Sequence, residues 1–165
     1  MRYPTRLAFA TMFVAIPSVA LAADPCALVS RTDASATLGK PSAPGTSSGP
    51  ERDEDSSGQV SYCTYRAGTS AMIVSVVEFA SSAEATKALT LNMVKGRMDE
   101  DGTKVSEEPG IGEKTFYAVS TEGSMYVFLK GNKVVGVAIG GPGSPKAAAV
   151  KGALKANAIA AAAKV

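Results

Sequence analysis

Two cysteines are the residues with the most informative chemistry in this 165-residue chain, because the chain contains no histidine. Without histidine the chain lacks the usual general base at neutral pH, which excludes Ser-His-Asp and Cys-His catalysis and most transition-metal sites. No lysine, tyrosine or carboxylate pair has a recognisable catalytic spacing. We therefore predict that the protein is not an enzyme and that it holds no cofactor or metal.

The N-terminus indicates the compartment in which the cysteines lie. Arg2 and Arg6 precede an uncharged apolar run that ends in an Ala-Leu-Ala triplet, the order of parts in an export signal. The run has 16 residues, including a proline, and is shorter than the roughly 20 residues of a transmembrane helix. We predict a signal peptide at residues 1–22, a single domain at residues 23–165, a periplasmic or secreted location, and no transmembrane segment after signal removal.

Three roles are open to Cys26: lipid attachment, a metal or redox site, and a disulfide. Asp24 and Pro25 precede it, whereas a lipoprotein signal places a small residue there. Two isolated cysteines cannot complete a tetrahedral zinc site, and the chain has no CxxC motif. Because the number of cysteines is even and the compartment is oxidising, we predict a structural disulfide between Cys26 and Cys63. In the chain-entropy model a loop of this length is stabilised by roughly 4 kcal/mol.

The charges indicate no general affinity for nucleic acid. The chain has 17 basic and 15 acidic residues, and two of the basic residues lie in the predicted signal, so the exported domain is formally neutral. The charges are nonetheless segregated: residues 99–113 hold six acids and one lysine, while residues 130–165 hold six lysines and no acid. Such poles steer partners in some proteins, but solvated faces are the commoner cause.

Two stretches match known ligand loops only in part. Residues 53–58, DEDSSG, begin like a calcium loop, but its twelfth position is Thr64 where a bidentate glutamate is needed. In PGIGEKT, Glu113 breaks the spacing of a phosphate-binding loop, so we interpret the stretch as a turn.

The apolar pattern predicts the elements that position these residues. Hairpin-sized, glycine-bearing connectors favour antiparallel neighbours, so the fold class is α+β, with a sheet of about five strands and helices packed on it. Residues 71–79 are apolar on both faces and are predicted to form an interior strand. The predicted strands are 59–68, 71–80, 114–120, 124–130 and 133–140; the predicted long helices are 81–96, capped by Ser81, and 145–163.

Residues 40–58 contain three glycines, three prolines and no large apolar residue, so they are predicted to form a mobile loop within the domain. Beside this loop, Tyr62, Tyr65 and Arg66 form a candidate contact surface. A second candidate surface is the lysine face of the last helix, which carries Lys146, Lys151 and Lys155.

Several short motifs resemble a family of small, mainly actinobacterial envelope proteins, many of them lipoproteins, which is catalogued as a domain of unknown function. The motifs are DPCALVSRTDASATLGKP, YCTYR, EEPGIGEKTF and GNKVVGV, followed by an alanine-rich helix. The resemblance covers most of residues 24–163 and implies the same disulfide and a sheet-plus-helix fold. This chain departs from the family in having no lipidation cysteine, and in having Lys114-Thr115 where small residues are usual.

Similar folds in that setting serve as extracellular sensor or binding modules. We therefore expect an exported, non-enzymatic interaction module whose partner is another envelope or secreted protein. The alternative is a small hydrolase, or a carrier of a lipid or other small ligand, with a carboxylate-based or apolar site. A deep lined pocket favours the alternative, and a filled core with a flat or grooved surface favours the module.

Overall fold

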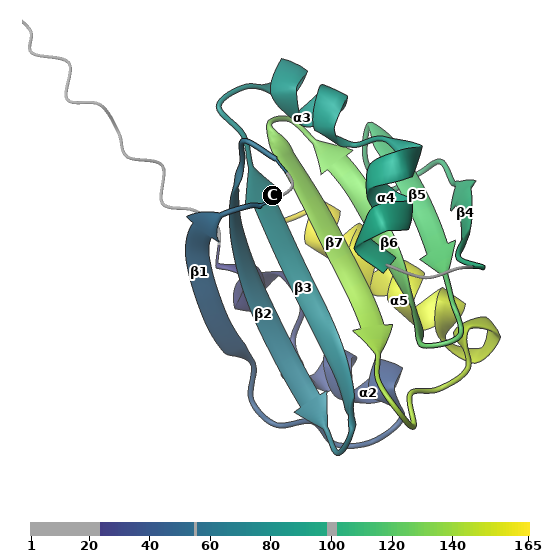
Figure 1. Ribbon diagram of the computed structural model, residues 1–165. Coiled ribbons are helices and arrows are strands. Elements are labelled where there is room, and N and C mark those ends of the chain that lie inside the picture. The colour runs from purple at the N-terminus through teal and green to yellow at the C-terminus, as the bar shows by residue number, and fades with distance from the viewer. Residues whose placement is uncertain (1–23, 55, 99–101) are drawn as a thin grey trace, which may run out of the picture.

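The computed structural model describes residues 24–54, 56–98 and 102–165; the predicted signal peptide lies outside them. The chain has an α+β fold with helices on both faces of one antiparallel sheet (Figure 1). The strands are β1 (Thr46–Arg52), β2 (Gln59–Ala67), β3 (Ser70–Glu78), β4 (Lys104–Glu107), β5 (Lys114–Val119), β6 (Gly123–Lys130) and β7 (Lys133–Gly140). The helices are α1 (Pro25–Leu28), α2 (Arg31–Leu38), α3 (Ser82–Ala88), α4 (Leu91–Met98) and α5 (Ala147–Ala162).

The strands lie in the order β1-β2-β3-β7-β6-β5-β4, and every neighbouring pair is antiparallel. They form two meanders, β1 to β3 and β4 to β7. The connection through α3 and α4 carries the chain from the centre of the sheet to its far edge. The last strand, β7, then returns to the centre and pairs with β3, so the two meanders join through long-range hydrogen bonds.

The sheet has seven strands, not about five, and the two additional strands, β1 and β4, are its edges. The prediction of a loop over residues 40–58 is wrong for Thr46–Arg52, which pairs with β2 as β1. All seven residues of β1 are exposed, so its side chains carry no apolar pattern, and the strand is held mainly by its backbone pairing with β2. At Gly49 the backbone φ is +91°, and a Cβ would lie 2.5 Å from the Val60 carbonyl oxygen. Only glycine fits this irregularity.

One face of the sheet is covered by α1, α2 and α5 (Figure 1). We call it the covered face. Strand alternation directs Met72, Val74 and Val76 of β3 to this side, and all three are buried. They pack with Leu38 of α2 and with a stripe on α5 in one apolar core. The members of that stripe are Val150, Leu154, Ala158, Ala161 and Ala162.

The last helix begins two residues later than predicted, after Lys146 as N-cap, and no side chain caps it. Its burial against the sheet agrees with the prediction. Alanine has the highest helix propensity, and its small side chain lets the helix axis lie close to β6 and β7.

The opposite face carries the helix pair α3–α4. Ser81 caps α3, as predicted, and accepts a hydrogen bond from the Glu84 amide at 3.2 Å. The single predicted helix over residues 81–96 is broken at Leu89 and Thr90. The Thr90 hydroxyl accepts a hydrogen bond from the Met93 amide and so starts a second helix. Leu89 is fully buried, and the break lets α4 turn over β5 and β4.

Candidate functional site

The structure separates the three residues predicted to form a contact surface. Side chains alternate along β2, so Tyr65 points to the covered face, whereas Tyr62 and Arg66 point to the opposite face. Tyr65 is 3 % exposed and belongs to the core. Tyr62 is half-buried and Arg66 is exposed. The structure therefore brings Tyr62 and Arg66 onto one face and removes Tyr65 from any surface.

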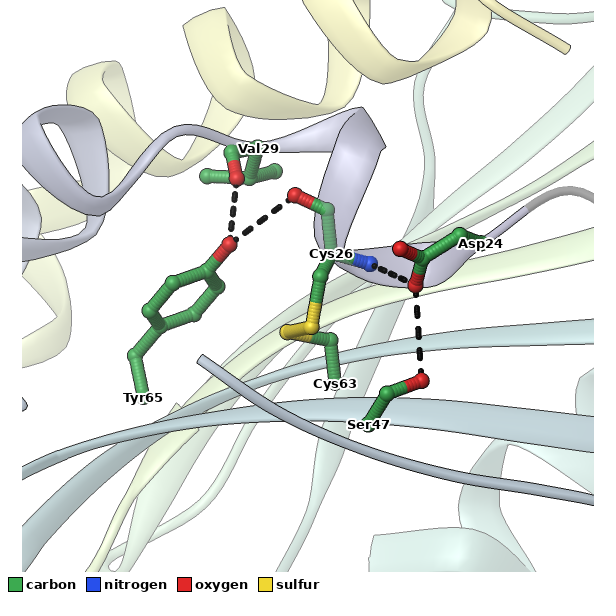
Figure 2. The surroundings of a disulfide bond; sticks show 6 residues. All are labelled: Asp24, Cys26, Val29, Ser47, Cys63 and Tyr65. Atoms are coloured by element: carbon green, nitrogen blue, oxygen red, sulfur yellow. Dashed lines mark hydrogen bonds between the residues drawn. A yellow bond between two sulfur atoms is a disulfide. The ribbon is translucent and has the colours of Figure 1, made fainter. Parts of the chain in front are cut away.

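Tyr65 instead holds α1 in place beside the disulfide (Figure 2). Its hydroxyl lies 2.5 Å from the Val29 carbonyl oxygen and 3.1 Å from that of Cys26, and donates to this pair of acceptors. Burial, together with the nearby Asp24 carboxylate, raises the pKa of Tyr65. The phenol therefore stays protonated and serves as a structural donor.

The predicted Cys26–Cys63 disulfide is present, with the two Cα atoms 5.0 Å apart. Cys63 is fully buried, and Asp24 caps α1 by accepting a hydrogen bond from the Cys26 amide at 3.0 Å. The same carboxylate oxygen accepts a weak hydrogen bond from the Ser47 hydroxyl at 3.4 Å (Figure 2). These contacts join α1, β1 and β2 at one corner of the fold. The bond uses both cysteines of the chain, so neither is a thiol nucleophile.

Part of the face that carries α3–α4 has no helix of the described residues over it. In Figure 1 the lower parts of β2, β3 and β7 face the viewer without cover. We call this surface the open half-face. Burial increases from β3 towards β6. In one cross-strand row, Ile73 on β3 is 40 % exposed, its partner Ala138 on β7 is half-buried, and the next residue, Met125 on β6, is buried. The surface consists of Tyr62, Thr64, Arg66, Ala71, Ile73, Ser75, Gly136 and Ala138.

The residues at the centre of the open half-face have short side chains or none, and nearly all members of the surface are uncharged. Its centre is formed by Ser75 and Gly136, which are cross-strand partners. A Cβ at Gly136 would lie 2.5 Å from the Ser75 hydroxyl oxygen, so any larger residue there would displace that side chain. The only charged member is Arg66. The surface mixes polar side chains, which are those of Tyr62, Thr64, Arg66 and Ser75, with the exposed apolar side chain of Ile73 and the small residues around it.

A second cluster, on the covered face, was missed by the sequence analysis. Its centre is the Glu108 carboxylate, which accepts a hydrogen bond from the Tyr126 hydroxyl at 2.9 Å. The ammonium groups of Lys151 and Lys155 lie 2.5 and 3.5 Å from its two oxygens. The Lys151 ammonium also lies 4.5 Å from the ring centroid of Tyr117, which packs on Tyr126 at 4.8 Å. Glu108 belongs to the acidic segment, residues 99–113, and both lysines belong to the lysine-rich segment, residues 130–165. The two oppositely charged segments are therefore in contact at this cluster.

The environment of Glu108 sets its protonation. Burial alone would raise the pKa of Glu108, but hydrogen bonds from Lys151 and Tyr126 and the charges of both lysines outweigh burial and lower it. Burial and the Glu108 carboxylate raise the pKa of Tyr126. Glu108 is therefore an anion at neutral pH. Its oxygens are engaged by three donors, which makes it a poor general base.

The lysine face predicted as the second candidate surface is only partly free. Lys151 and Lys155 bind Glu108, and Lys146 is exposed at the start of α5. Near that residue, a cavity of about 320 Å³ lies between the β5–β6 turn and the segment leading into α5. Its walls include Glu122 as well as Lys146.

Other chemistry is sparse in residues 24–54, 56–98 and 102–165. No group of three or more histidine, cysteine, aspartate or glutamate side chains gathers there in a way that could hold a metal ion. Within the same ranges, no helix is long and apolar enough to cross a membrane.

Comparison of the chain with protein-family models, with curated proteins and with solved structures finds no match.

Proposed function

We propose that the protein is an exported, non-enzymatic binding module that captures another envelope or secreted protein through its open half-face. The observation that carries this proposal is the composition of that surface. It combines an exposed Ile73, a half-buried Tyr62 and a single charge at Arg66. The cores of protein interfaces are likewise depleted in charge and enriched in tyrosine and arginine.

The shape of the open half-face supports the same function. Its small side chains, Ser75, Gly136 and Ala138, lie low on the sheet beside Ile73 and Tyr62. A partner side chain can approach the backbone of β3 and β7 there without a helix in the way. Tyrosine and arginine, the residue types of Tyr62 and Arg66, are enriched among interface hot spots, where energetically near-neutral contacts around them exclude water.

The export part of the proposal is supported by the disulfide. A structural disulfide persists in oxidising compartments such as the periplasm or the extracellular space. The resemblance to envelope proteins points to the same location, with a signal peptide at residues 1–22 that is removed on export.

The alternative of a small hydrolase is less well supported, because Glu108, the carboxylate at the centre of the described ionic cluster, already receives three donors. The alternative of a small-ligand carrier is favoured by one observation, a cavity beneath α3–α4 whose lining combines apolar side chains with Ser56, Lys87 and Thr90.

The proposal is tested by affinity capture from the exported fraction of the native cell, with immobilised wild type and two variants. Ile73→Asp places a charge at the centre of the open half-face. Ile159→Asp is the matched control, because Ile159 is 47 % exposed on α5, on the other side of the molecule. We expect the wild type and Ile159→Asp to retain the same partner and Ile73→Asp to lose it. Equal retention by Ile73→Asp, with both variants folded, would contradict the proposal.

A further inference from the structure

A cavity of about 270 Å³ lies where the helix pair α3–α4 meets the end of β3 and the start of β7. Its apolar wall is formed by Val77, Phe79, Val134 and Met93. An apolar cavity of about 150 Å³ is sufficient to hold benzene. The space under α3–α4 is open to solvent and has polar as well as apolar walls, and its volume is sufficient for one aromatic ring or a short hydrocarbon chain together with a polar group.

The walls of this cavity are fixed by the fold. The turn between β6 and β7 is tied to β3 twice: the Asn132 side chain donates to the Phe79 carbonyl at 2.8 Å, and the Phe79 amide donates to the Asn132 carbonyl at 2.9 Å. A Cβ at Gly58 would lie 2.5 Å from a methyl carbon of Val77, so the β1–β2 connection lies directly against the same strand end. A ligand site with such walls is preformed and binds without reorganisation of the sheet.

The polar groups of the lining favour a negatively charged ligand. Among the described residues, Lys87, in the last turn of α3, is the only charged lining residue, and it makes no ion pair of 4 Å or less with another of them. The Thr90 hydroxyl accepts a hydrogen bond from the Met93 amide, which leaves its proton to donate. The other lining hydroxyl, Ser56, already donates to Asp53. Lys87 and Thr90 are both exposed at the rim of this partly apolar space, where an ammonium and a hydroxyl donor match a carboxylate attached to a hydrocarbon group.

We propose that this cavity binds a small apolar carboxylic acid, with its hydrocarbon part against Val77, Phe79 and Val134 and its carboxylate at Lys87 and Thr90. The site is separate from the open half-face, so it stands or falls independently of the protein-binding function. The ligand occupies the space between α3–α4 and the sheet.

The experiment is an NMR titration of the ¹⁵N-labelled exported domain with 3-phenylpropionate and with its neutral analogue 3-phenyl-1-propanol. We expect saturable shifts at the amides of Val77, Val134 and Lys87, in the millimolar range, with the acid binding more tightly than the alcohol. The variant Lys87→Gln should weaken binding of the acid by about two- to fivefold and leave binding of the alcohol unchanged, because the lysine is partly solvated. Lys95→Gln, on the exposed side of α4, is the matched control and should change neither.

Three results would overturn this proposal. They are the absence of saturable shifts at the cavity amides, tighter binding of the alcohol than of the acid, and equal weakening of the acid by the two lysine variants. Ala88→Phe fills the cavity from α3 and should abolish the shifts from both probes. A thermal melt shows that this variant is folded before it is titrated, and Lys87→Gln tests the site by itself if it is not.

Discussion

The two faces of the same strands differ in how far helices cover them, and β3 shows the difference in adjacent residues. Val74 is fully buried under the helices of the covered face, whereas Ile73, pointing the other way, is 40 % exposed. The sequence of β3 is apolar on both faces, but α3 and α4 are short and lie over β7, β5 and β4. The apolar pattern of β3 correctly indicates burial on the covered face, whereas among the described residues the helices cover only part of the opposite face.

The largest expected effect comes from placing the same charge on each face of β3. Val74→Asp buries an unpaired carboxylate and should prevent folding or cost at least about 3 kcal/mol of unfolding free energy. Ile73→Asp, one residue away, should cost no more than about 1 kcal/mol, because its side chain reaches water. Urea unfolding of the two variants measures the contrast, and similar losses in both would mean that the open half-face is as buried as the covered one.

The next effect concerns α5, which completes the cover of the sheet. Leu154 is fully buried against the sheet, so Leu154→Ala should lower the unfolding free energy by about 2–5 kcal/mol. Ile159→Ala, on the solvent side of the same helix, should change it by less than about 0.5 kcal/mol. If calorimetry finds the two variants equally stable, α5 is not part of the folding core.

The disulfide links α1, one of the helices on the covered face, to β2. Replacing Cys26 and Cys63 together by serine should lower the unfolding free energy by about 2–4 kcal/mol. The wild type treated with a reductant should behave like the double variant. An unchanged melting temperature in both would show that the hydrogen bonds of Tyr65 and Asp24 are sufficient to hold α1.

A smaller, pH-dependent effect is expected where Glu108 joins the β4–β5 connection to α5. The pKa of Glu108 is lowered in the folded protein from its usual value of 4.5, so its ion pairs stabilise the fold above that pH. This contribution is lost as the pH falls through the lowered pKa. Its size should not exceed about 1 kcal/mol, because both lysines are partly solvated.

The corresponding measurement compares the thermal stability of wild type, Glu108→Gln and the exposed control Glu107→Gln from pH 7 to pH 2. The advantage of wild type over Glu108→Gln should be constant above about pH 5 and shrink at lower pH. An advantage that grows on acidification would show that the sign of the pKa shift is wrong.

The sequence predicted those elements whose side chains are buried in a regular pattern. Strands β2, β3, β5, β6 and β7 and the helix α5 all lie where the apolar periodicity placed them. The edge strands β1 and β4 were missed because their side chains are largely exposed, and backbone pairing leaves no trace in the residue types. The break at Leu89 was also missed, although Thr90 is a residue type that caps helices and its hydroxyl accepts a hydrogen bond from the Met93 amide.

The candidate site was predicted only in part. Cysteine parity was enough to identify the disulfide. Tyr62 and Tyr65 were placed on one surface, although residues three apart in a strand lie on opposite faces, so the sequence itself contained the correction. The pairing of Tyr117 with Tyr126 depends on the register of β5 and β6, which the short connecting turn could have indicated. The open half-face could not be foreseen, because it depends on where α3–α4 ends.

The central claim, that the open half-face is the surface on which a partner binds, is tested most directly by photo-cross-linking in the native cell. p-Benzoylphenylalanine is introduced in place of Ile73 in one variant and in place of Ile159 in another, and both are exported and irradiated. The account predicts a discrete covalent adduct with an envelope or secreted protein from position 73 and none from position 159. An adduct from position 159 alone, or none from position 73 when both variants are folded and exported, would contradict it.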